Sequence, residues 1–211
     1  MTILEEKRYI CEIGRRMYKR GLVAANDGNI SVKTSEGNLI ITPTGISKGF
    51  MEPEMIVRIN RNGEKLDKNA PDPSSEVQMH IKVYQERDEV GAVVHAHPPH
   101  ATAFAVAGKP LDKKILPEAI ISLGTVPVAG YATPSTEEIP ASIEEFLLDY
   151  NAVLLSNHGV LTWGEDLKQA YFRMETVEFY ARIIMLTENL SEIELTEEQV
   201  TKLMNAFDVK K

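Results

Sequence analysis

The sequence predicts one α/β domain over residues 1–211, and three observations carry this prediction. Apolar residues recur at helical spacing in several segments, and short apolar runs typical of strands lie between them. The first strand-like runs are joined by connections too short for a parallel crossover, which indicates antiparallel pairing. No repeat, low-complexity segment or Gly/Ser-rich linker divides the chain, and its length is normal for one large domain.

The predicted helices are recognised by their spacing and by their end signals. Ile10, Ile13 and Met17 follow a helical period, and Gly21 is a plausible stop just after Arg20. A capping box pairs a hydroxyl residue with an acidic or amide residue three positions later at a helix start. The other predicted helices, with these signals, are Ser75 with Gln78 to about Arg87, Pro99 through Ala107, Ser135 with Glu138 toward Asp149, roughly Leu167 to Leu190, and Thr196 with Gln199.

The predicted strands are short and mostly apolar. Asn62-Gly63 supplies the positive φ angles of a tight hairpin turn between two of them. Pro98-Pro99 ends another, which reads as a buried strand. The predicted strands are Ile30–Val32, Leu39–Ile41, Ile56–Ile59, Glu64–Leu66, Ala92–His97, Ala152–Leu155 and Val160–Trp163.

Composition and charge exclude several classes of protein. The 23 Lys and Arg residues against 31 Asp and Glu give a net charge of −8, which argues against general nucleic-acid binding. No apolar stretch approaches the length of a membrane span, and the charged N-terminus does not resemble a signal peptide. A single cysteine, Cys11, fits a reducing compartment. We therefore expect a cytoplasmic protein without nucleic-acid or membrane partners.

Three of the five histidines lie at the ends of predicted strands. His95 and His97 are two residues apart on a strand, so their side chains lie on the same face. Hydrogen bonds to backbone or carboxylate groups would satisfy them, but a His-x-His pair at a strand end favours a metal. His158, in a bend between two strands, would complete a three-imidazole site with an open position. His80 is expected on a helix surface, and His100 is expected to cap or pack after the prolines.

Small polar groups cluster in three other segments. Ser74 and Ser75 precede a helix whose free N–H groups attract anions, and Glu76 follows them directly. Glu76 reads either as a partner of the helix dipole or as a functional carboxylate. The loops at Asn26–Asn29 and Thr42–Gly45 read either as ordinary turns or as donors for an oxyanion. If these loops bind an oxyanion, Lys48 could add a positive charge to the site; the more ordinary interpretation of Lys48 is a solvent-exposed lysine.

Five motifs occur in the order and approximate spacing found in one known family. They are Gly28-Asn29-Ile30-Ser31, Thr42-Pro43-Thr44-Gly45, Pro73-Ser74-Ser75-Glu76, His95-Ala96-His97 and Asn157-His158-Gly159. On these residues the chain resembles the class II aldolase/adducin-head family over nearly its whole length. Within that family it is most similar to the L-fuculose-1-phosphate aldolase branch.

The resemblance implies a three-layer α/β/α sandwich with a mostly antiparallel central sheet, in a homotetramer with active sites at subunit interfaces. It implies a divalent cation, usually Zn2+, on His95, His97 and His158, although three imidazoles also suit Mn2+, Co2+ or Fe2+. Glu76 matches the family's acid/base, which also ligates the metal when substrate is absent. The phosphate-binding residues expected from the loops and the resemblance are Gly28, Asn29, Thr44, Gly45, Ser74 and Ser75.

The implied reaction is reversible cleavage of a ketose 1-phosphate, such as L-fuculose 1-phosphate, to dihydroxyacetone phosphate and an aldehyde such as L-lactaldehyde. Two departures leave the aldehyde open: Glu118 is the nearest counterpart of a family tyrosine, and the C-terminal tyrosine is missing. Glu118 is either a second proton-transfer group or a loop carboxylate. Ribulose-phosphate 4-epimerisation and methylthioribulose-1-phosphate dehydration remain alternatives on the same site. A non-catalytic adducin-like module, which lacks the metal histidines, fits less well.

Overall fold

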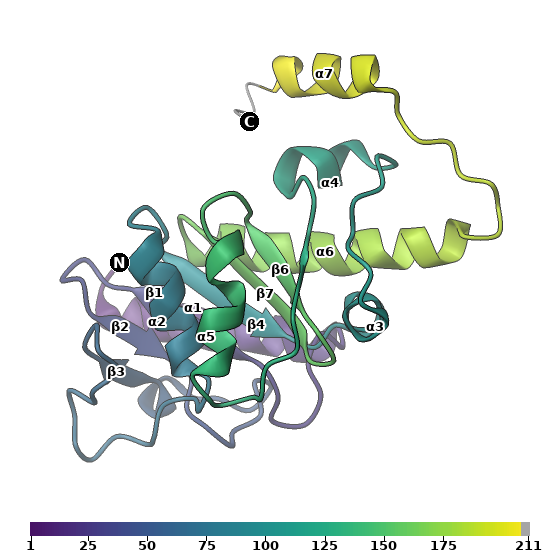
Figure 1. Ribbon diagram of the computed structural model, residues 1–211. Helices are drawn as coiled ribbons and strands as arrows, with labels where there is room; N and C mark the ends of the chain where they lie inside the picture. Colours follow the sequence, from purple (N-terminus) through teal and green to yellow (C-terminus); the bar gives the residue numbers. More distant parts are fainter. Residues whose placement is uncertain (208–211) are drawn as a thin grey trace.

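A mixed β-sheet forms the centre of the computed structural model, which describes residues 1–207 (Figure 1). The described strands follow the order β3-β2-β1-β4-β7-β6-β5. Every neighbouring pair is antiparallel except β5 and β6, which are parallel. The strands are β1 (Asn29–Lys33), β2 (Leu39–Ile41), β3 (Val57–Ile59), β4 (Ala92–Ala96), β5 (Val128–Ala129), β6 (Ala152–Leu155) and β7 (Gly159–Gly164).

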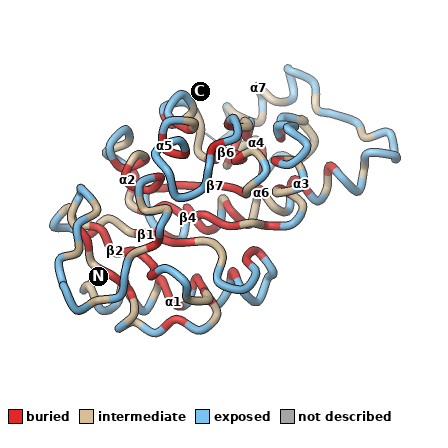
Figure 2. Tube along the Cα trace, turned by 60° about the horizontal axis from the view of Figure 1, so that its bottom comes forward, coloured by how far each residue is buried: buried red, intermediate tan, exposed pale blue. Residues whose placement is uncertain are grey.

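Helices cover both faces of this sheet, and the buried residues lie between the layers (Figure 2). One hydrophobic cluster joins the sheet to α1, α3 and α6, and a second joins it to α2 and α5. Along β4, Val94 belongs to the first cluster and Val93 to the second, as strand alternation requires. The helices are α1 (Ile3–Lys19), η1 (Pro53–Met55), α2 (Val77–Glu86), α3 (Pro99–Ala107), α4 (Pro117–Ser122), α5 (Glu138–Ile143), η2 (Glu144–Phe146), α6 (Leu167–Thr187) and α7 (Glu197–Ala206).

This architecture confirms the predicted α/β sandwich with a mostly antiparallel sheet. The first and last predicted helices are also confirmed, including the capping box of Thr196 with Gln199. Beyond the main layers, α4 packs against α6, and α7 packs against α4 (Figure 1). None of the helices formed by residues 1–207 combines the length and apolarity that a bilayer crossing requires.

Two predicted capping boxes are wrong. Ser75 does not cap α2, because the helix begins at Val77 and Glu76 occupies the N-cap position without a side-chain capping bond. Ser135 adopts a left-handed backbone with φ of 63° and donates a hydrogen bond from its hydroxyl to Ser75 Oγ. The two serines thus bond to each other across 60 residues of sequence, and α5 begins later, at Glu138.

The second predicted hairpin forms only in part. The strand Val57–Ile59 pairs with β2, while residues 64–66 contribute one isolated bridge, between Ile59 and Lys65. The turn itself is present, since the Gly63 N–H donates to Asn60 O and Gly63 has a φ of 88°.

The antiparallel pairing of β1, β4 and β7 brings three segments to one edge of the sheet. Asn29 at the start of β1 pairs with His95 near the end of β4, and Ala96 pairs with Val160 near the start of β7. The turn from β6 to β7 places His158 beside this edge, with Asn157 in the left-handed region at φ of 56°.

Gly159 lies in the closest contact between these segments. A Cβ there would lie 2.5 Å from Ala96 O, 2.6 Å from His97 Cδ2 and 3.3 Å from His95 Cε1. The absent side chain lets β7 begin directly against the two histidines.

We expect Gly159→Ala to lower the free energy of unfolding by about 1–3 kcal/mol, because its methyl group meets a backbone carbonyl that cannot move away. Gly130→Ala is the matched control, since a Cβ at Gly130 has no neighbour within 4 Å; it should change stability by less than about 0.5 kcal/mol. Denaturant unfolding of both variants measures the difference. Equal stability of the two variants would contradict a close contact between Gly159 and the Ala96 carbonyl.

Candidate metal centre and anion-binding cavity

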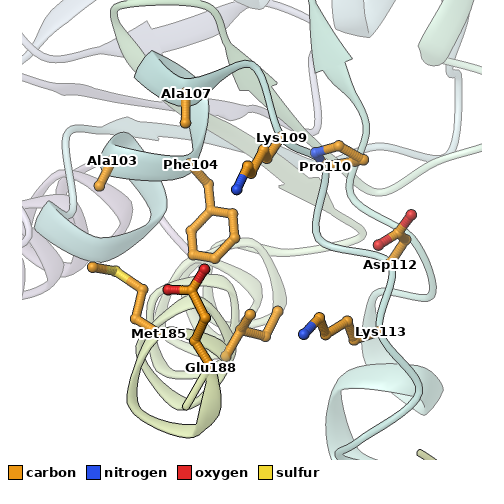
Figure 3. A pocket seen from close by; sticks show the side chains of 10 residues that line it. Ala103, Phe104, Ala107, Lys109, Pro110, Asp112, Lys113, Met185 and Glu188 are labelled. Carbon is orange, nitrogen blue, oxygen red and sulfur yellow. The ribbon is translucent and has the colours of Figure 1, made fainter.

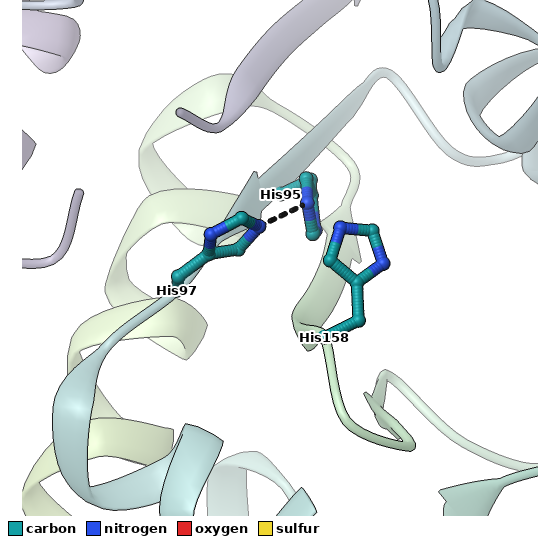
Figure 4. Close-up of side chains that lie close together, drawn as sticks. All are labelled: His95, His97 and His158. Carbon is teal, nitrogen blue, oxygen red and sulfur yellow. Dashed lines mark hydrogen bonds between the residues drawn. The ribbon is translucent and has the colours of Figure 1, made fainter. Parts of the chain in front are cut away.

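His95, His97 and His158 converge at the sheet edge (Figure 4). His95 is fully buried in β4, while His97, just after β4, and His158, in the β6–β7 turn, are partly buried. One ring nitrogen from each lies within 4.8 Å of the others. The structure thus brings together the three imidazoles that the sequence predicts to share a site.

Hydrogen bonding fixes the ring of His95. Its Nδ1 donates to Val160 O at 2.9 Å, so in the neutral ring Nε2 carries the free lone pair. That Nε2 lies 3.0 Å from His97 Nε2, and His97 Nδ1 lies 3.5 Å from Asp27 Oδ2. Burial lowers the pKa of His95 to about 3 and also lowers the pKa of His97, so both rings are neutral at pH 7 and available as ligands.

Glu76 faces the same point from the start of α2. Its Oε2 lies 3.4 Å from His95 Nε2, and its Oε1 lies 3.2 Å from His158 Nε2. Asn29 Nδ2 donates to Oε2 at 2.8 Å. Burial raises the pKa of Glu76, but His95, His158 and the Asn29 hydrogen bond outweigh it and hold that pKa well below its usual range.

These residues fit a divalent cation. Two ligands about 2.0–2.2 Å from a tetrahedral ion lie about 3.3–3.6 Å apart. The His95–His97, His95–Glu76 and His158–Glu76 separations are 3.0, 3.4 and 3.2 Å, and ring nitrogens of the three imidazoles lie within 4.8 Å of one another. Glu76 Oε1 and His158 Nδ1 are buried and have no hydrogen-bond partner among residues 1–207. Buried polar atoms without partners are costly, and coordination would satisfy the carboxylate oxygen.

A cavity of about 230 Å³ opens beside the histidines, and the predicted phosphate-binding residues line it. The N–H groups of Gly45 and Ser75 donate to no other residue within 1–207. Gly45 takes a φ of 71°, which glycine adopts without strain. The predicted residues on its lining are Gly28, Asn29, Thr44, Gly45, Ser74, Ser75, Glu76, His97 and His158.

Lys48 lines this cavity too, and the expectation of a solvated lysine is wrong. Its side chain is 1% exposed, and Nζ donates to Asn26 O at 3.1 Å and to Ile46 O at 2.5 Å. The ammonium group therefore bridges the two loops that flank β1 and β2. Burial lowers its pKa to about 8, against the opposing effect of Asp27 and Glu76.

The expectation that His80 lies on a helix surface is also wrong. His80 is fully buried on the face of α2 that packs against β1. Its Nδ1 lies 2.7 Å from Ser31 Oγ, and Nε2 bonds to Asn29 Oδ1. His100 packs after the prolines as predicted, with its Nδ1 2.6 Å from Glu178 Oε1.

Glu118 lies apart from the cavity. It occupies the exposed first turn of α4, which packs against α6 and α7, and it does not line the cavity beside the histidines. Within one chain, the structure therefore does not bring Glu118 to the site.

A second, more apolar cavity of about 370 Å³ lies between α3, the following segment and the end of α6 (Figure 3). Phe104, Ile184 and Met185 line it, with Lys109 and Glu188 among its charged groups. None of the predicted site residues lines this cavity.

Comparison with known proteins gives one family. Residues 8–185 match the family described as Class II Aldolase and Adducin N-terminal domain. The chain is 36% identical over 180 residues to an L-fuculose phosphate aldolase of Methanococcus maripaludis, covering 85% of this chain and 96% of that protein. It is 32% identical over 211 residues to a 5-deoxy-D-ribulose 1-phosphate aldolase of Bacillus thuringiensis, covering 99% and 98%.

A different reaction is named among the other similar proteins. A 3-oxo-tetronate 4-phosphate decarboxylase of Escherichia coli is 31% identical over 178 residues, covering 82% of this chain and 83% of that one. Among solved structures, an L-fuculose 1-phosphate aldolase superposes with a TM-score of 0.87 at 33% identity, covering 96% and 95%. YgbL of Escherichia coli, described as a putative aldolase/epimerase/decarboxylase, superposes with a TM-score of 0.90 at 28% identity, covering 96% and 99%.

We expect the purified protein to bind about one divalent cation per chain, and His158→Ala to weaken Zn2+ affinity by more than about tenfold, because one of three imidazoles is lost. His100→Ala is the control, since that ring contacts Glu178 away from the cluster. Elemental analysis and competition with a chelating dye give stoichiometry and affinity. Unchanged affinity in His158→Ala would remove His158 from the ligand set.

Proposed function

Since the chain belongs to the family of class II aldolase and adducin N-terminal domains, we propose that it is a metal-dependent aldolase acting on a ketose 1-phosphate. The products are dihydroxyacetone phosphate and an aldehyde, with L-fuculose 1-phosphate or a close analogue as substrate. The observation that supports this most directly is the meeting of three imidazoles and Glu76 beside a cavity whose lining also offers N–H and hydroxyl groups.

The reaction sets a clear demand on the site. Cleaving the bond between C3 and C4 of a ketose 1-phosphate leaves negative charge on C3, next to the carbonyl carbon of the three-carbon product. A divalent cation held by His95, His97 and His158 supplies Lewis-acid stabilisation of that charge. Zn2+ is the first expectation, and Mn2+, Co2+ or Fe2+ also suit imidazole ligands.

Glu76 carries the proton chemistry in this proposal. Its carboxylate is ionised at neutral pH and lies beside the histidines. In the condensation direction it would accept the proton from C3; in cleavage it would first take a proton from solvent and then deliver it to C3. In the absence of substrate, the same oxygens suit the cation as a further ligand.

The phosphate group is assigned to the serines before α2 and the loop after β2, which line the same cavity. Ser74 and Ser75 precede α2, while Thr44 and Gly45 approach from the loop after β2. Backbone N–H groups at a helix start and in a tight loop bind anions well. Lys48 adds a positive charge beneath these loops, which suits a phosphate dianion.

A homotetramer with active sites at subunit interfaces completes the proposal. The exposed position of Glu118 on α4 means that it takes part only if another copy brings it to the cavity. Retro-aldol cleavage also needs a group that removes the proton from the C4 hydroxyl, and Glu118 of the partner subunit is our candidate.

Decarboxylation is a second candidate function, favoured by the similarity to a 3-oxo-tetronate 4-phosphate decarboxylase. Loss of CO2 from that compound leaves the same three-carbon enediolate as retro-aldol cleavage of a ketose 1-phosphate. The cation, Glu76 and the phosphate-binding residues would serve both reactions. Only the aldolase needs a second group for the departing aldehyde.

A substrate panel with and without Zn2+ distinguishes these functions. The proposal expects dihydroxyacetone phosphate and an aldehyde from one or more ketose 1-phosphates. Release of CO2 from 3-oxo-tetronate 4-phosphate would instead show the decarboxylase. An isomeric pentulose phosphate would indicate an epimerase, and a dehydrated ketone would indicate a dehydratase. If the protein neither turned over a substrate nor bound a metal, an adducin-like binding module would be the remaining interpretation.

Glu76→Gln is expected to retain the bound metal and to lower kcat by about 100-fold or more, because the amide cannot exchange the C3 proton. Steady-state cleavage assays and elemental analysis on the same preparation measure both quantities. A variant with wild-type kcat would exclude Glu76 as the acid/base.

Lys48→Met is expected to raise the KM for the phosphorylated substrate, and the Ki of inorganic phosphate, by about tenfold or more, because a charged hydrogen-bond donor is lost. In the wild type both constants should rise as the pH passes about 8, where the ammonium group loses its proton. Exposed Lys68→Met is the control and should match the wild type. A pH-independent Ki in the wild type would contradict this role for Lys48.

A further inference from the structure

A buried chain of hydrogen bonds, formed alternately by residues of α2 and β1, runs from Tyr84 to Glu76. Tyr84 Oη lies 2.8 Å from Ser31 Oγ, which lies 2.7 Å from His80 Nδ1. His80 Nε2 bonds to Asn29 Oδ1, and Asn29 Nδ2 donates to Glu76 Oε2 at 2.8 Å. Ser31 and His80 are fully buried, and Asn29 is 2% exposed.

The local geometry explains why one ring reaches both β1 residues. Asn29 and Ser31 are two apart on a strand, so both side chains face α2. His80 lies one helical turn after Glu76 and presents its two nitrogens to these two side chains. The His80 ring thereby links Ser31 to Asn29, the residue that donates to the Glu76 carboxylate.

The donor and acceptor in each hydrogen bond of the chain follow from its final acceptor, the Glu76 carboxylate. The Glu76 carboxylate only accepts, so the amide nitrogen of Asn29 faces it and Oδ1 faces His80. His80 Nε2 must then donate. In a neutral ring Nδ1 accepts from Ser31, whose oxygen accepts from Tyr84.

The surroundings of His80 favour this neutral ring. Burial lowers its pKa to about 4, although Glu76 opposes the shift. With Nε2–H as the only ring donor, the Asn29 amide has one orientation that satisfies every partner. The reversed amide would place two acceptors, Oδ1 and Glu76 Oε2, at 2.8 Å from each other.

We propose that His80 is a positioning residue that fixes the Asn29 amide and, through it, the orientation of the Glu76 carboxylate. This inference rests on the proposed function, in which Glu76 moves the C3 proton. Oε2 accepts a hydrogen bond from Asn29, whereas the buried Oε1 forms no hydrogen bond among the residues described and lies 3.2 Å from His158 Nε2. Oε2 is therefore held in place, and we assign the substrate proton to Oε1.

Exchange of the C3 protons of dihydroxyacetone phosphate with solvent, followed by NMR, isolates this step from aldehyde chemistry. His80→Leu removes both ring bonds and should slow exchange about 10- to 100-fold at saturating ligand. KM for dihydroxyacetone phosphate and metal content should stay within about threefold, because the imidazole ligands and the donors of Thr44, Gly45, Ser74 and Ser75 are unchanged and Asn29 itself is kept.

His80→Gln is the matched variant, since its amide supplies one donor and one acceptor. It should restore exchange to within about fivefold of the wild type. Tyr84→Phe removes only the distant donor and should have a smaller effect than His80→Leu. Exchange in His80→Leu at the wild-type rate would overturn the inference, as would equal losses in His80→Leu and His80→Gln.

The ring state of His80 provides a test that needs no variant. Two-bond correlation spectra of the metal-loaded protein labelled with 15N-histidine should show one neutral ring protonated on Nε2 throughout pH 6–8. A ring protonated on Nδ1, or charged, would overturn the inference even if no substrate is turned over. Absence of exchange and cleavage in the wild type, with the Nε2–H ring present, would instead count against the proposed function alone.

Discussion

The structure depends on gathering three imidazoles and a carboxylate at one buried sheet edge. Burial of such groups costs free energy, and the fold offsets this cost with specific partners. Val160 O accepts from His95, and Asn29 donates to Glu76. Bringing these groups together also explains why β7 begins with Gly159, since a larger residue there would separate β7 from His95 and His97.

The part of this site that the sequence predicts is the part set by local geometry. Strand alternation places His95 and His97 together, and the serines before α2 mark the position of Glu76. His158 is predicted from its bend between two strands and from the family resemblance, but its contact with the pair depends on the pairing of β4 with β7, a long-range contact that no local pattern predicts. The two failed caps have a similar cause, because Ser75 and Ser135 bond to each other instead of to helix ends.

His80 and Lys48 show what local pattern misses. His80 lies at helical spacing from Val77 and Tyr84, on the apolar stripe of α2, so the signal for its burial was present in the sequence. Lys48 has no such signal. Its burial depends on the approach of its own segment to Gly14 of α1, where a Cβ would lie 2.8 Å from Lys48 O.

In the proposed function, the charges around the cavity would suit more than one phosphorylated substrate. Glu76 and Asp27 are carboxylates, Lys48 carries one positive charge, and a divalent cation on the histidines would bring the sum to a single positive charge. A bound phosphate dianion would bring the sum to a single negative charge before any bond breaks. In the proposed reaction, the negative charge formed at C3 would develop near His95, His97 and His158, which would hold the cation. In this proposal the cation and the N–H and hydroxyl donors would stabilise different charges, so neither decides whether the second product is an aldehyde or CO2.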